Sequence, residues 1–155
     1  MIIREATEED FDAVARVWKE SWISVGISNA IDDAVTVADL RARIPDRIAG
    51  GWSLFVAECE GRIDAMLAIE CALNHLDQIF VAPSAQGRRI GSALLAHART
   101  LMPEEIWLKT AANNTRAREW YEREGFVLEK VEYNPKFLRD DAYYRWRAFF
   151  QPALC

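Results

Sequence analysis

The stretch of sequence that decides the fold runs from Ile79 to Leu95 and reads IFVAPSAQGRRIGSALL. Its first residues are apolar and rich in β-branched and aromatic side chains, as in a buried strand, and Pro83 stops that strand. A turn with glycine and arginine follows and leads directly into a helix with apolar residues at helical spacing. This order of strand, turn and helix indicates a mixed α/β protein.

The turn at residues 86–91 is suited to hold an anion. Glycines let backbone N–H groups approach a ligand closely, and a helix N-terminus carries about half a positive charge. Arg88 and Arg89 add cationic donors, so the turn predicts a site for a phosphate or pyrophosphate. It lacks the lysine of a Walker loop and does not match GxGxxG, which disfavours a nucleotide-phosphate binder. A plain strand-to-helix crossover with surface arginines is the alternative.

The remaining residues alternate between strand-like and helical patterns. Thr36 is expected to cap a helix that Pro45 kinks or ends, and Asn114 or Thr115 to cap another that ends at Gly125. Strands are expected at residues 2–4, 52–59, 62–71, 75–81, 106–110, 126–133 and 142–150, and helices at residues 8–22, 37–48, 86–102 and 115–124. Residues 1–155 should therefore form one domain, with a central mixed sheet of about seven strands flanked by about four helices.

The composition is that of an ordinary globular protein, with 51% hydrophobic and 28% charged residues in a chain of 155. The three cysteines form no CxxC pair and only two histidines are present, so neither a disulfide framework nor a metal site is expected. Charge from Arg4 onward and the lack of an 18-residue apolar run predict neither a signal peptide nor a membrane span, which favours a cytoplasmic protein. The net charge of −5 argues against nucleic-acid binding.

A second informative stretch runs from Asn113 to Phe126 and reads NNTRAREWYEREGF. Asn114, Ala117 and Tyr121 are spaced i, i+3 and i+7, so they share one face of the expected helix. A tyrosine beside a developing anion is able to donate a proton, although a helical tyrosine taken alone is more often a core residue.

Together, the two stretches resemble the GCN5-related N-acetyltransferase (GNAT) superfamily. Its acetyl-coenzyme A motif, Q/R-x-x-G-x-G/A at the start of a helix, is matched from Gln86 to Gly91. Its later pattern, N-x-x-A-x-x-x-Y-x-x-x-G-F, is matched from Asn114 to Phe126, and the order of elements agrees along essentially the whole chain. The resemblance implies an acetyl-coenzyme A-dependent N-acetyltransferase in which a primary amine attacks the thioester directly in a ternary complex.

The resemblance also implies roles for individual residues. Strand residues before the turn would offer backbone hydrogen bonds to the pantetheine arm, and the amides of the turn would cradle the pyrophosphate. Asn114 would touch the cofactor arm, and Tyr121 would protonate the departing thiolate. The residues expected at the cofactor are Ile79, Phe80, Val81, Gln86, Gly87, Arg88, Arg89, Ile90, Gly91, Ser92 and Asn114, and the expected catalytic residues are Tyr121 and His75.

The chain departs from the family pattern at two functional positions. Arg89 stands where the motif has its first glycine, so the affinity for the cofactor depends on whether glycine is needed there for close approach. His75 stands where some relatives have a glutamate as general base, and Asp77 on the same face of the strand would orient it. Asp77 itself, Glu70 or a water relay are the alternative bases, because Lys109 occupies the other position that relatives use.

The charge distribution indicates what kind of amine is the acceptor. Residues 1–80 carry a net charge of −8 and residues 81–155 a net charge of +3, unless this asymmetry is a random fluctuation on a solvated surface. In the family, the first two helices and the loop between them wall the acceptor site. Here that region holds Asp32, Asp33 and Asp39 beside Trp18 and Trp22, which predicts a small cationic amine. A protein N-terminus or lysine is an open alternative acceptor, and a module that binds coenzyme A without catalysis is an alternative function.

Other reactive or aromatic residues are assigned to packing. Cys71 is expected to be a buried apolar cysteine rather than an acyl-carrying nucleophile, and His97 to belong to the apolar stripe of a helix. The aromatic residues near the C-terminus predict either sheet core or an edge strand that pairs with a partner subunit in a homodimer. These residues are Tyr143, Tyr144, Trp146, Phe149 and Phe150.

Overall fold

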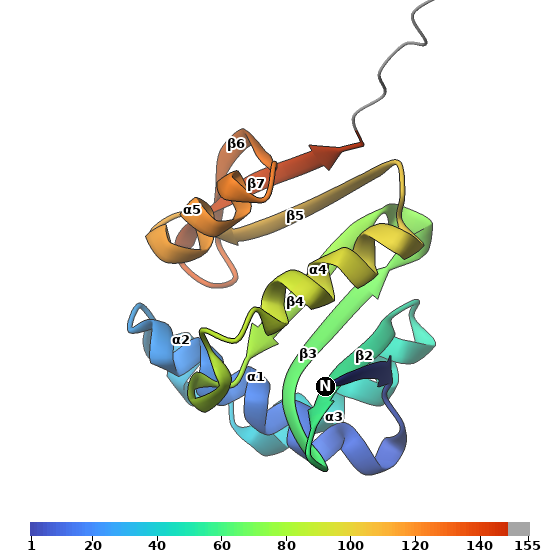
Figure 1. Cartoon of the computed structure of the whole chain (residues 1–155). Helices are drawn as coiled ribbons and strands as arrows, with labels where there is room; N and C mark the ends of the chain where they lie inside the picture. Colours follow the sequence, from blue (N-terminus) through green and yellow to red (C-terminus); the bar gives the residue numbers. More distant parts are fainter. Residues whose placement is uncertain (149–155) are drawn as a thin grey trace, which may run out of the picture.

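Seven strands form one mixed sheet in the computed structural model, which describes residues 1–148 (Figure 1). The strand order is β1-β2-β3-β4-β5-β7-β6, and only β4 and β5 run parallel to each other. All seven strands expected from the sequence are confirmed. Their bounds are β1 Ile2–Glu5, β2 Ser53–Cys59, β3 Arg62–Glu70, β4 His75–Val81, β5 Glu105–Ala111, β6 Val127–Asn134 and β7 Arg139–Arg147.

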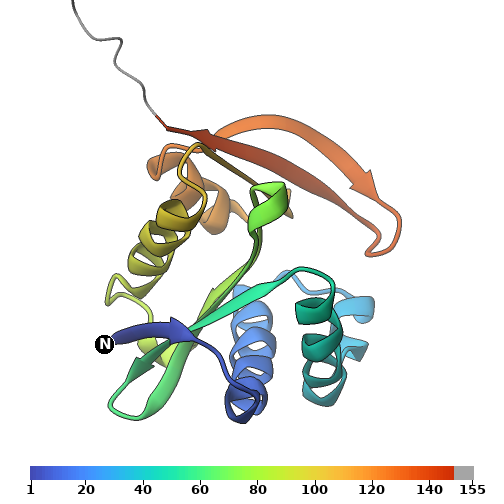
Figure 2. The same ribbon diagram turned by 90° about the vertical axis from the view of Figure 1, so that its right-hand side faces the viewer.

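Helices cover both faces of the sheet, with α1 and α3 on one face and α4 on the other (Figure 2). The four expected helices are confirmed, and a fifth short helix, α2, was missed. Within residues 1–148, no helix is long and apolar enough to cross a membrane. The helices are α1 Phe11–Val25, α2 Ala30–Ala34, α3 Val37–Ala49, α4 Ile90–Leu101 and α5 Thr115–Arg123, and 3₁₀ segments lie at Glu8–Asp10, Cys71–Leu73 and Pro83–Ala85.

Side chains at the helix starts account for most of these boundaries. The hydroxyl of Thr36 accepts a hydrogen bond from the Asp39 N–H at 3.0 Å, and the Asp39 carboxylate accepts one from the Thr36 N–H at 2.9 Å. Asn114, rather than Thr115, caps α5, since its side-chain oxygen accepts from the Ala117 N–H at 3.2 Å. These reciprocal contacts satisfy N–H groups that have no partner inside the helix.

The structure corrects three expectations about local structure. Of the two effects expected of Pro45, a kink or the end of the helix, the second is wrong, because α3 continues to Ala49; proline removes one N–H donor, and this exposed helix face tolerates the loss. α4 begins at Ile90 and not at Gln86, because Gly87 and Arg89 have positive φ angles of 84° and 60° that no α-helix contains. Cys71 lies exposed in a 3₁₀ segment and is not buried in a strand.

The core fills the space between the sheet and its helices. Val14 of α1, Ile44 of α3 and Leu94 of α4 are fully buried against the central strands. Tyr144 is also fully buried, and β7 lies between β5 and β6. The described part of the C-terminal aromatic run is therefore sheet core and not an edge. Phe149 and Phe150 lie outside the described residues.

The parallel strands β4 and β5 are paired in the sheet at only one position, His75 with Trp107. Beyond this pair the two strands diverge toward the end of β4 (Figure 1). The other neighbouring strands pair over four to seven residues, so the divergence is particular to this position. It opens the middle of the sheet where the turn into α4 begins.

We predict that stability depends on pH through Asp10, which joins β1 to the start of α1. Its carboxylate accepts hydrogen bonds from Arg4 at 2.8 and 3.0 Å and from the Thr7 N–H, and these lower its pKa to about 2. The charged form is favoured in the folded state, so its stabilisation is complete above pH 4 and is lost as the pH falls toward 2. Because Arg4 is one-third exposed, we expect a loss of only about 1–2 kcal/mol.

Urea unfolding of the wild type and of Asp10→Asn between pH 2 and pH 6 measures this effect. The variant should be less stable at pH 6 and should show a flatter pH dependence. Equal pH slopes in the two proteins would exclude Asp10 as the source.

Candidate active site

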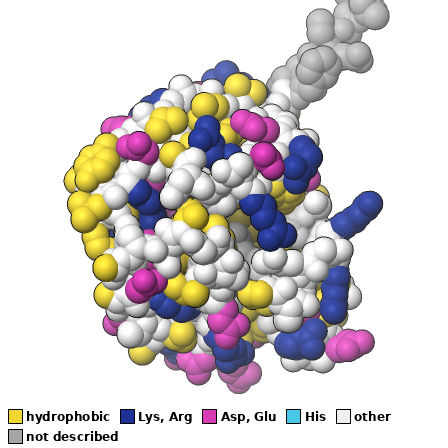
Figure 3. All heavy atoms as spheres, turned by 90° about the vertical axis from the view of Figure 1, so that its left-hand side faces the viewer, with side chains coloured by type: hydrophobic (Ala, Val, Ile, Leu, Met, Phe, Trp, Pro, Cys, Tyr) yellow, Lys and Arg dark blue, Asp and Glu magenta, His cyan; other side chains and the backbone are white. Residues whose placement is uncertain are grey.

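A cavity of about 910 Å³ lies where β4 and β5 diverge. Residues of α1, α2 and α3 line one side of it, and the turn before α4 together with α5 lines the other. Lysine and arginine side chains gather around a hollow on this face of the molecule (Figure 3). A cavity of this size holds a drug-sized ligand or a cofactor. All the site residues expected from the sequence line it except His75 and Arg88.

The backbone of β4 presents free polar groups to the cavity. In an antiparallel pair, residues that exchange hydrogen bonds alternate with residues that do not. The Ala82 N–H donates to the Asp64 carbonyl at 2.7 Å, so the alternation directs the groups of Phe80 toward β3 and those of Ile79 and Val81 toward the cavity. Among the three residues expected to bind the pantetheine arm, Ile79 and Val81 are therefore the ones with available backbone groups.

One of these backbone groups is already occupied. The carbonyl of Val81 accepts hydrogen bonds from the Ser21 hydroxyl at 3.0 Å and from the Gln86 side chain at 3.3 Å. These two contacts tie α1 and the turn to the end of β4. The Val81 N–H and both groups of Ile79 remain to meet a ligand.

The turn before α4 presents a row of amides. The first intrahelical hydrogen bond of α4 runs from the Ala93 N–H to the Arg89 carbonyl, so the N–H groups of residues 90–92 precede it and have no helical acceptor. Gly87 and Arg89 are both left-handed, and such residues bring successive N–H groups onto one side of a turn. A positive φ angle thus explains why the acetyl-coenzyme A motif has glycine at the position of Arg89. Arg89 adopts this angle at a cost of roughly 1–2 kcal/mol.

Packing explains why residue 91 is a glycine. A side chain at Gly91 would meet the Trp120 ring at 3.4 Å and Val81 at 3.8 Å. Trp120 therefore packs directly on the backbone of the first turn of α4 and joins α5 to the turn.

Tyr121 lies on α5 with its ring between Phe126 and Tyr144, at centroid distances of 5.6 and 6.3 Å. It is 8% exposed and lines the cavity. Burial raises the pKa of its phenol, so the hydroxyl stays protonated at neutral pH and is available as a hydrogen-bond donor. Asn114 begins the same helix and also lines the cavity.

His75 and Asp77 do not share a face, contrary to the expectation from strand periodicity. Ala68 faces Gln78 and Ile69 faces Leu76, so Asp77 is the extra residue of a β-bulge that interrupts the alternation. The His75 ring lies 3.8 Å from the Trp107 ring, and its Nδ1 lies 2.7 Å from Glu70 Oε1. Neither His75 nor Glu70 lines the cavity, whereas Asp77 does.

Asp77 is held by the side chain of Trp52, which stands just before β2. The indole Nε1 of Trp52 donates to Asp77 Oδ2 at 2.7 Å, and Trp52 in turn packs against Trp18 at 5.7 Å. Trp52 is 5% exposed, so this hydrogen bond fixes the carboxylate at the cavity wall.

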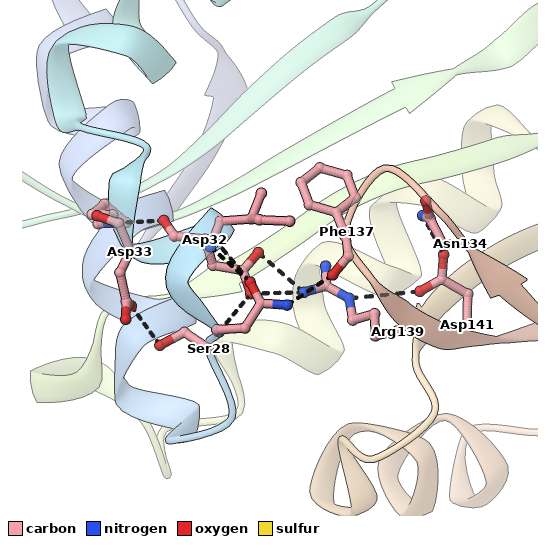
Figure 4. A network of polar contacts seen from close by, with 10 residues as sticks. Ser28, Asp32, Asp33, Asn134, Phe137, Arg139 and Asp141 are labelled. Carbon is pink, nitrogen blue, oxygen red and sulfur yellow. Dashed lines mark hydrogen bonds and ion pairs between the residues drawn. The ribbon is translucent and has the colours of Figure 1, made fainter.

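The acidic residues expected to attract a cationic acceptor are engaged elsewhere. Asp32 accepts hydrogen bonds from Arg139 at 2.8 and 3.0 Å and from the Asn29 N–H at 3.1 Å (Figure 4). Asp33 accepts from Ser28, Asp39 caps α3, and neither lines the cavity. Asp32, Asp33 and Asp39 therefore offer no free negative charge at this wall.

Arg139 connects the two ends of the cavity wall. Its guanidinium lies 4.9 Å from the Trp22 ring while it pairs with Asp32, so it links α1 and α2 to the start of β7 (Figure 4). Asp141 lies 3.8 Å from the Arg139 Nε and completes the network. This bridge closes one end of the cavity.

Several lining residues were missed in the sequence, and among them are Arg43, Arg47 and Trp52. The signal that could have found the arginines is their spacing from Leu40. Positions 40, 43 and 47 share one face of α3, and Leu40 was assigned to the stripe that faces the protein. Trp52 stands just before β2 and carried no such signal.

The chain is similar to known acetyltransferases along most of its length. The acetyltransferase (GNAT) domain family matches residues 50–128, about half of the chain. A probable N-acetyltransferase of Mycobacterium tuberculosis is 29% identical over 140 residues, which cover 82% of this chain and 80% of the relative.

Solved structures of similar fold cover nearly the whole chain. A GCN5-related N-acetyltransferase from Rhodopseudomonas palustris superposes with a TM-score of 0.80 at 16% identity, covering 94% of both chains. The PaiA N-acetyltransferase from Thermoplasma acidophilum, solved in complex with coenzyme A, gives 0.74 at 20% identity, covering 94% of this chain and 98% of that one. These similarities show that the fold is shared.

We predict that Arg89 is strained and that glycine relieves the strain. Arg89→Gly and Arg89→Ala remove the same charged group, but only alanine keeps the penalty of a Cβ at φ of 60°. The glycine variant should be the more stable of the two by about 1 kcal/mol. Urea unfolding of both variants measures the difference. An alanine variant of equal or greater stability would contradict a left-handed residue at this position.

Proposed function

Because the chain belongs to the acetyltransferase (GNAT) domain family, we propose that it transfers the acetyl group of acetyl-coenzyme A to a primary amine in a ternary complex. The observation that carries the proposal is the divergence of β4 from β5. The cavity at this divergence is lined by Ile79 and Val81 of β4, by the residues with unpaired amides at the start of α4 and by Tyr121. We assign residues 1–155 to this one domain.

The cofactor site is proposed to run from the turn back along β4. The amides of residues 90–92 would bind the pyrophosphate, helped by the positive end of α4 and by Arg89. The free backbone groups of Ile79 and Val81 would then pair with the amides of the pantetheine arm, as a neighbouring strand would. At about 3.3 Å per residue, the acyl end would reach the level of Asp77.

Asp77 is proposed to accept the proton that the amine loses, directly or through a water molecule. It replaces His75 in this role because it lines the cavity and His75 does not. Trp52 would hold the carboxylate in place through its 2.7 Å hydrogen bond. The amine would approach from the side of α1 and α3, opposite the turn that holds the pyrophosphate.

Tyr121 is proposed to donate its proton to the departing thiolate. Its raised pKa keeps the hydroxyl protonated until negative charge develops on the sulfur. Its aromatic neighbours Phe126 and Tyr144 fix the ring, so the donor is positioned before the reaction.

We predict that Tyr121→Phe lowers kcat about 100-fold, which is a typical contribution of a general acid. The dissociation constant for acetyl-coenzyme A should stay within about twofold, because the phenol acts on the leaving group. Thiol release and the thermal shift with acetyl-coenzyme A measure the two quantities. Tyr133→Phe is the control, since Tyr133 is 57% exposed on β6 and lies outside the cavity. Full kcat in Tyr121→Phe would rule out Tyr121 as the proton donor. If the protein instead bound coenzyme A without catalysis, the wild type itself would show no turnover.

We predict that Asp77→Asn lowers kcat/KM about 100-fold at neutral pH. The loss should shrink as the pH approaches the pKa of the amine, because the amine then arrives without its extra proton. A pH profile of thiol release measures this convergence. Asp46→Asn is the control, since Asp46 is exposed on α3 and does not line the cavity. A loss that is constant with pH would mean that Asp77 has a structural role.

A further inference from the structure

Two arginines on α3 face the acceptor side of the cavity. Arg43 and Arg47 are spaced i, i+4, so they lie one turn apart on the same side of the helix, and both line the cavity. Leu40 precedes them on this face and is buried. The acceptor wall is therefore apolar at one end of α3 and cationic toward the other.

Neither arginine forms an ion pair with a residue that the structure describes, although the pKa of the Asp39 carboxyl, one turn earlier on α3, is lowered by hydrogen bonds from Thr36 and also by the nearby charge of Arg43. Within residues 1–148, no carboxylate oxygen lies within 4.0 Å of Arg43 or Arg47, whereas the partly buried Arg41 on the same helix pairs with Asp12 at 3.1 Å. Two further cations line this wall, and both are engaged: Lys19 donates to the carbonyls of Asp32 and Asp33 in α2, and Arg139 pairs with Asp32. Arg43 and Arg47 are thus the cations of this wall with free donors.

Trp52 places one of these arginines beside the proposed base. The guanidinium of Arg47 lies 5.9 Å from the Trp52 ring, within cation–π range, and the Arg47 carbonyl accepts a hydrogen bond from the Trp52 N–H at 2.9 Å. The same indole donates to Asp77 at 2.7 Å. A fixed negative group and a free positive group therefore contact one buried ring.

We propose that the acceptor is a zwitterion, a small primary amine that carries a carboxylate, as amino acids do. Asp77 would face its ammonium group, and Arg43 and Arg47 would bind its carboxylate, a group that the planar guanidinium matches with two parallel hydrogen bonds. Trp18, Val35 and Leu40 line the rest of this wall, so an apolar side chain is preferred. This inference rests on the proposed acetyl transfer and replaces the cationic acceptor expected from the sequence.

The arginines and the expected pyrophosphate site line the same cavity but lie on opposite sides of the opening in the sheet. The arginines belong to α3, which covers one face, whereas the turn with the free amides begins α4 on the opposite face (Figure 2). Arg89, Arg116 and Arg123 line the cavity on the side of α4 and α5 and supply cations for the cofactor phosphates. An anion of the acceptor therefore accounts for Arg43 and Arg47 better than a phosphate of the cofactor.

The test compares amines that differ only in the carboxylate. Thiol release is measured with phenylalanine against phenethylamine, with leucine against isoamylamine, and with putrescine as a purely cationic amine. We expect kcat/KM to be at least tenfold higher for each amino acid than for its decarboxylated counterpart. The double variant Arg43→Gln/Arg47→Gln should reduce that ratio at least tenfold, and Arg47→Glu should shift the preference toward putrescine.

Arg41→Gln is the matched control, because it removes an arginine from the same helix outside the cavity, and its ratio should equal that of the wild type. Equal or better acetylation of the amines without a carboxylate would overturn the proposal, and so would an unchanged ratio in the double variant. A thermal shift with acetyl-coenzyme A but no thiol release from any amino acid would overturn it too. Absence of that shift would instead reject the proposed acetyl transfer, on which the inference depends.

Discussion

The site depends on one constraint in the sheet, which is that the parallel strands β4 and β5 pair only at His75 and Trp107. A backbone donor or acceptor left without a partner is unfavourable, so strands that separate inside a domain need something to occupy the opening. The sequence after β4 supplies a turn with unpaired amides at the mouth of the same opening. The divergence of β4 from β5 therefore provides both the opening in which an extended pantetheine arm would lie and the position at which its pyrophosphate would bind.

The helices on the two sides of the opening carry groups suited to different parts of the reaction. α4 and α5 carry the groups suited to phosphate and to the leaving thiolate, whereas α1 and α3 carry the wall that meets the acceptor. Trp120, which packs on Gly91, and Ser21, which donates to Val81, bind both sides to the end of β4. The positive φ angle at position 89 favours glycine, but this chain has arginine there. The strain is tolerated because neighbouring residues hold the turn.

Local patterns in the sequence predicted the strands, four helices, a cap at Asn114 or Thr115 and the part of the cavity lining that comes from β4, the turn before α4 and one face of α5, because these depend on spacing and on side-chain type. The errors arose where tertiary context decides. The extra residue at Asp77 shifts a register that strict alternation takes for granted, and it moves His75 away from the cavity. The acidic residues of α2 and of the first turn of α3 looked like an acceptor wall, but hydrogen bonds to Asn29, Ser28, Thr36 and Arg139 occupy them. A net charge summed over half of a chain does not reveal which charges are already paired.

Amide hydrogen exchange of β4, measured by NMR with and without acetyl-coenzyme A, tests the central claim most directly. The account predicts that the Phe80 amide is protected in the free protein, because it bonds to β3. The Ile79 and Val81 amides should exchange faster in the free protein and slow at least tenfold when acetyl-coenzyme A is added. Unchanged exchange at Ile79 and Val81, with protection appearing elsewhere in the chain, would contradict the account.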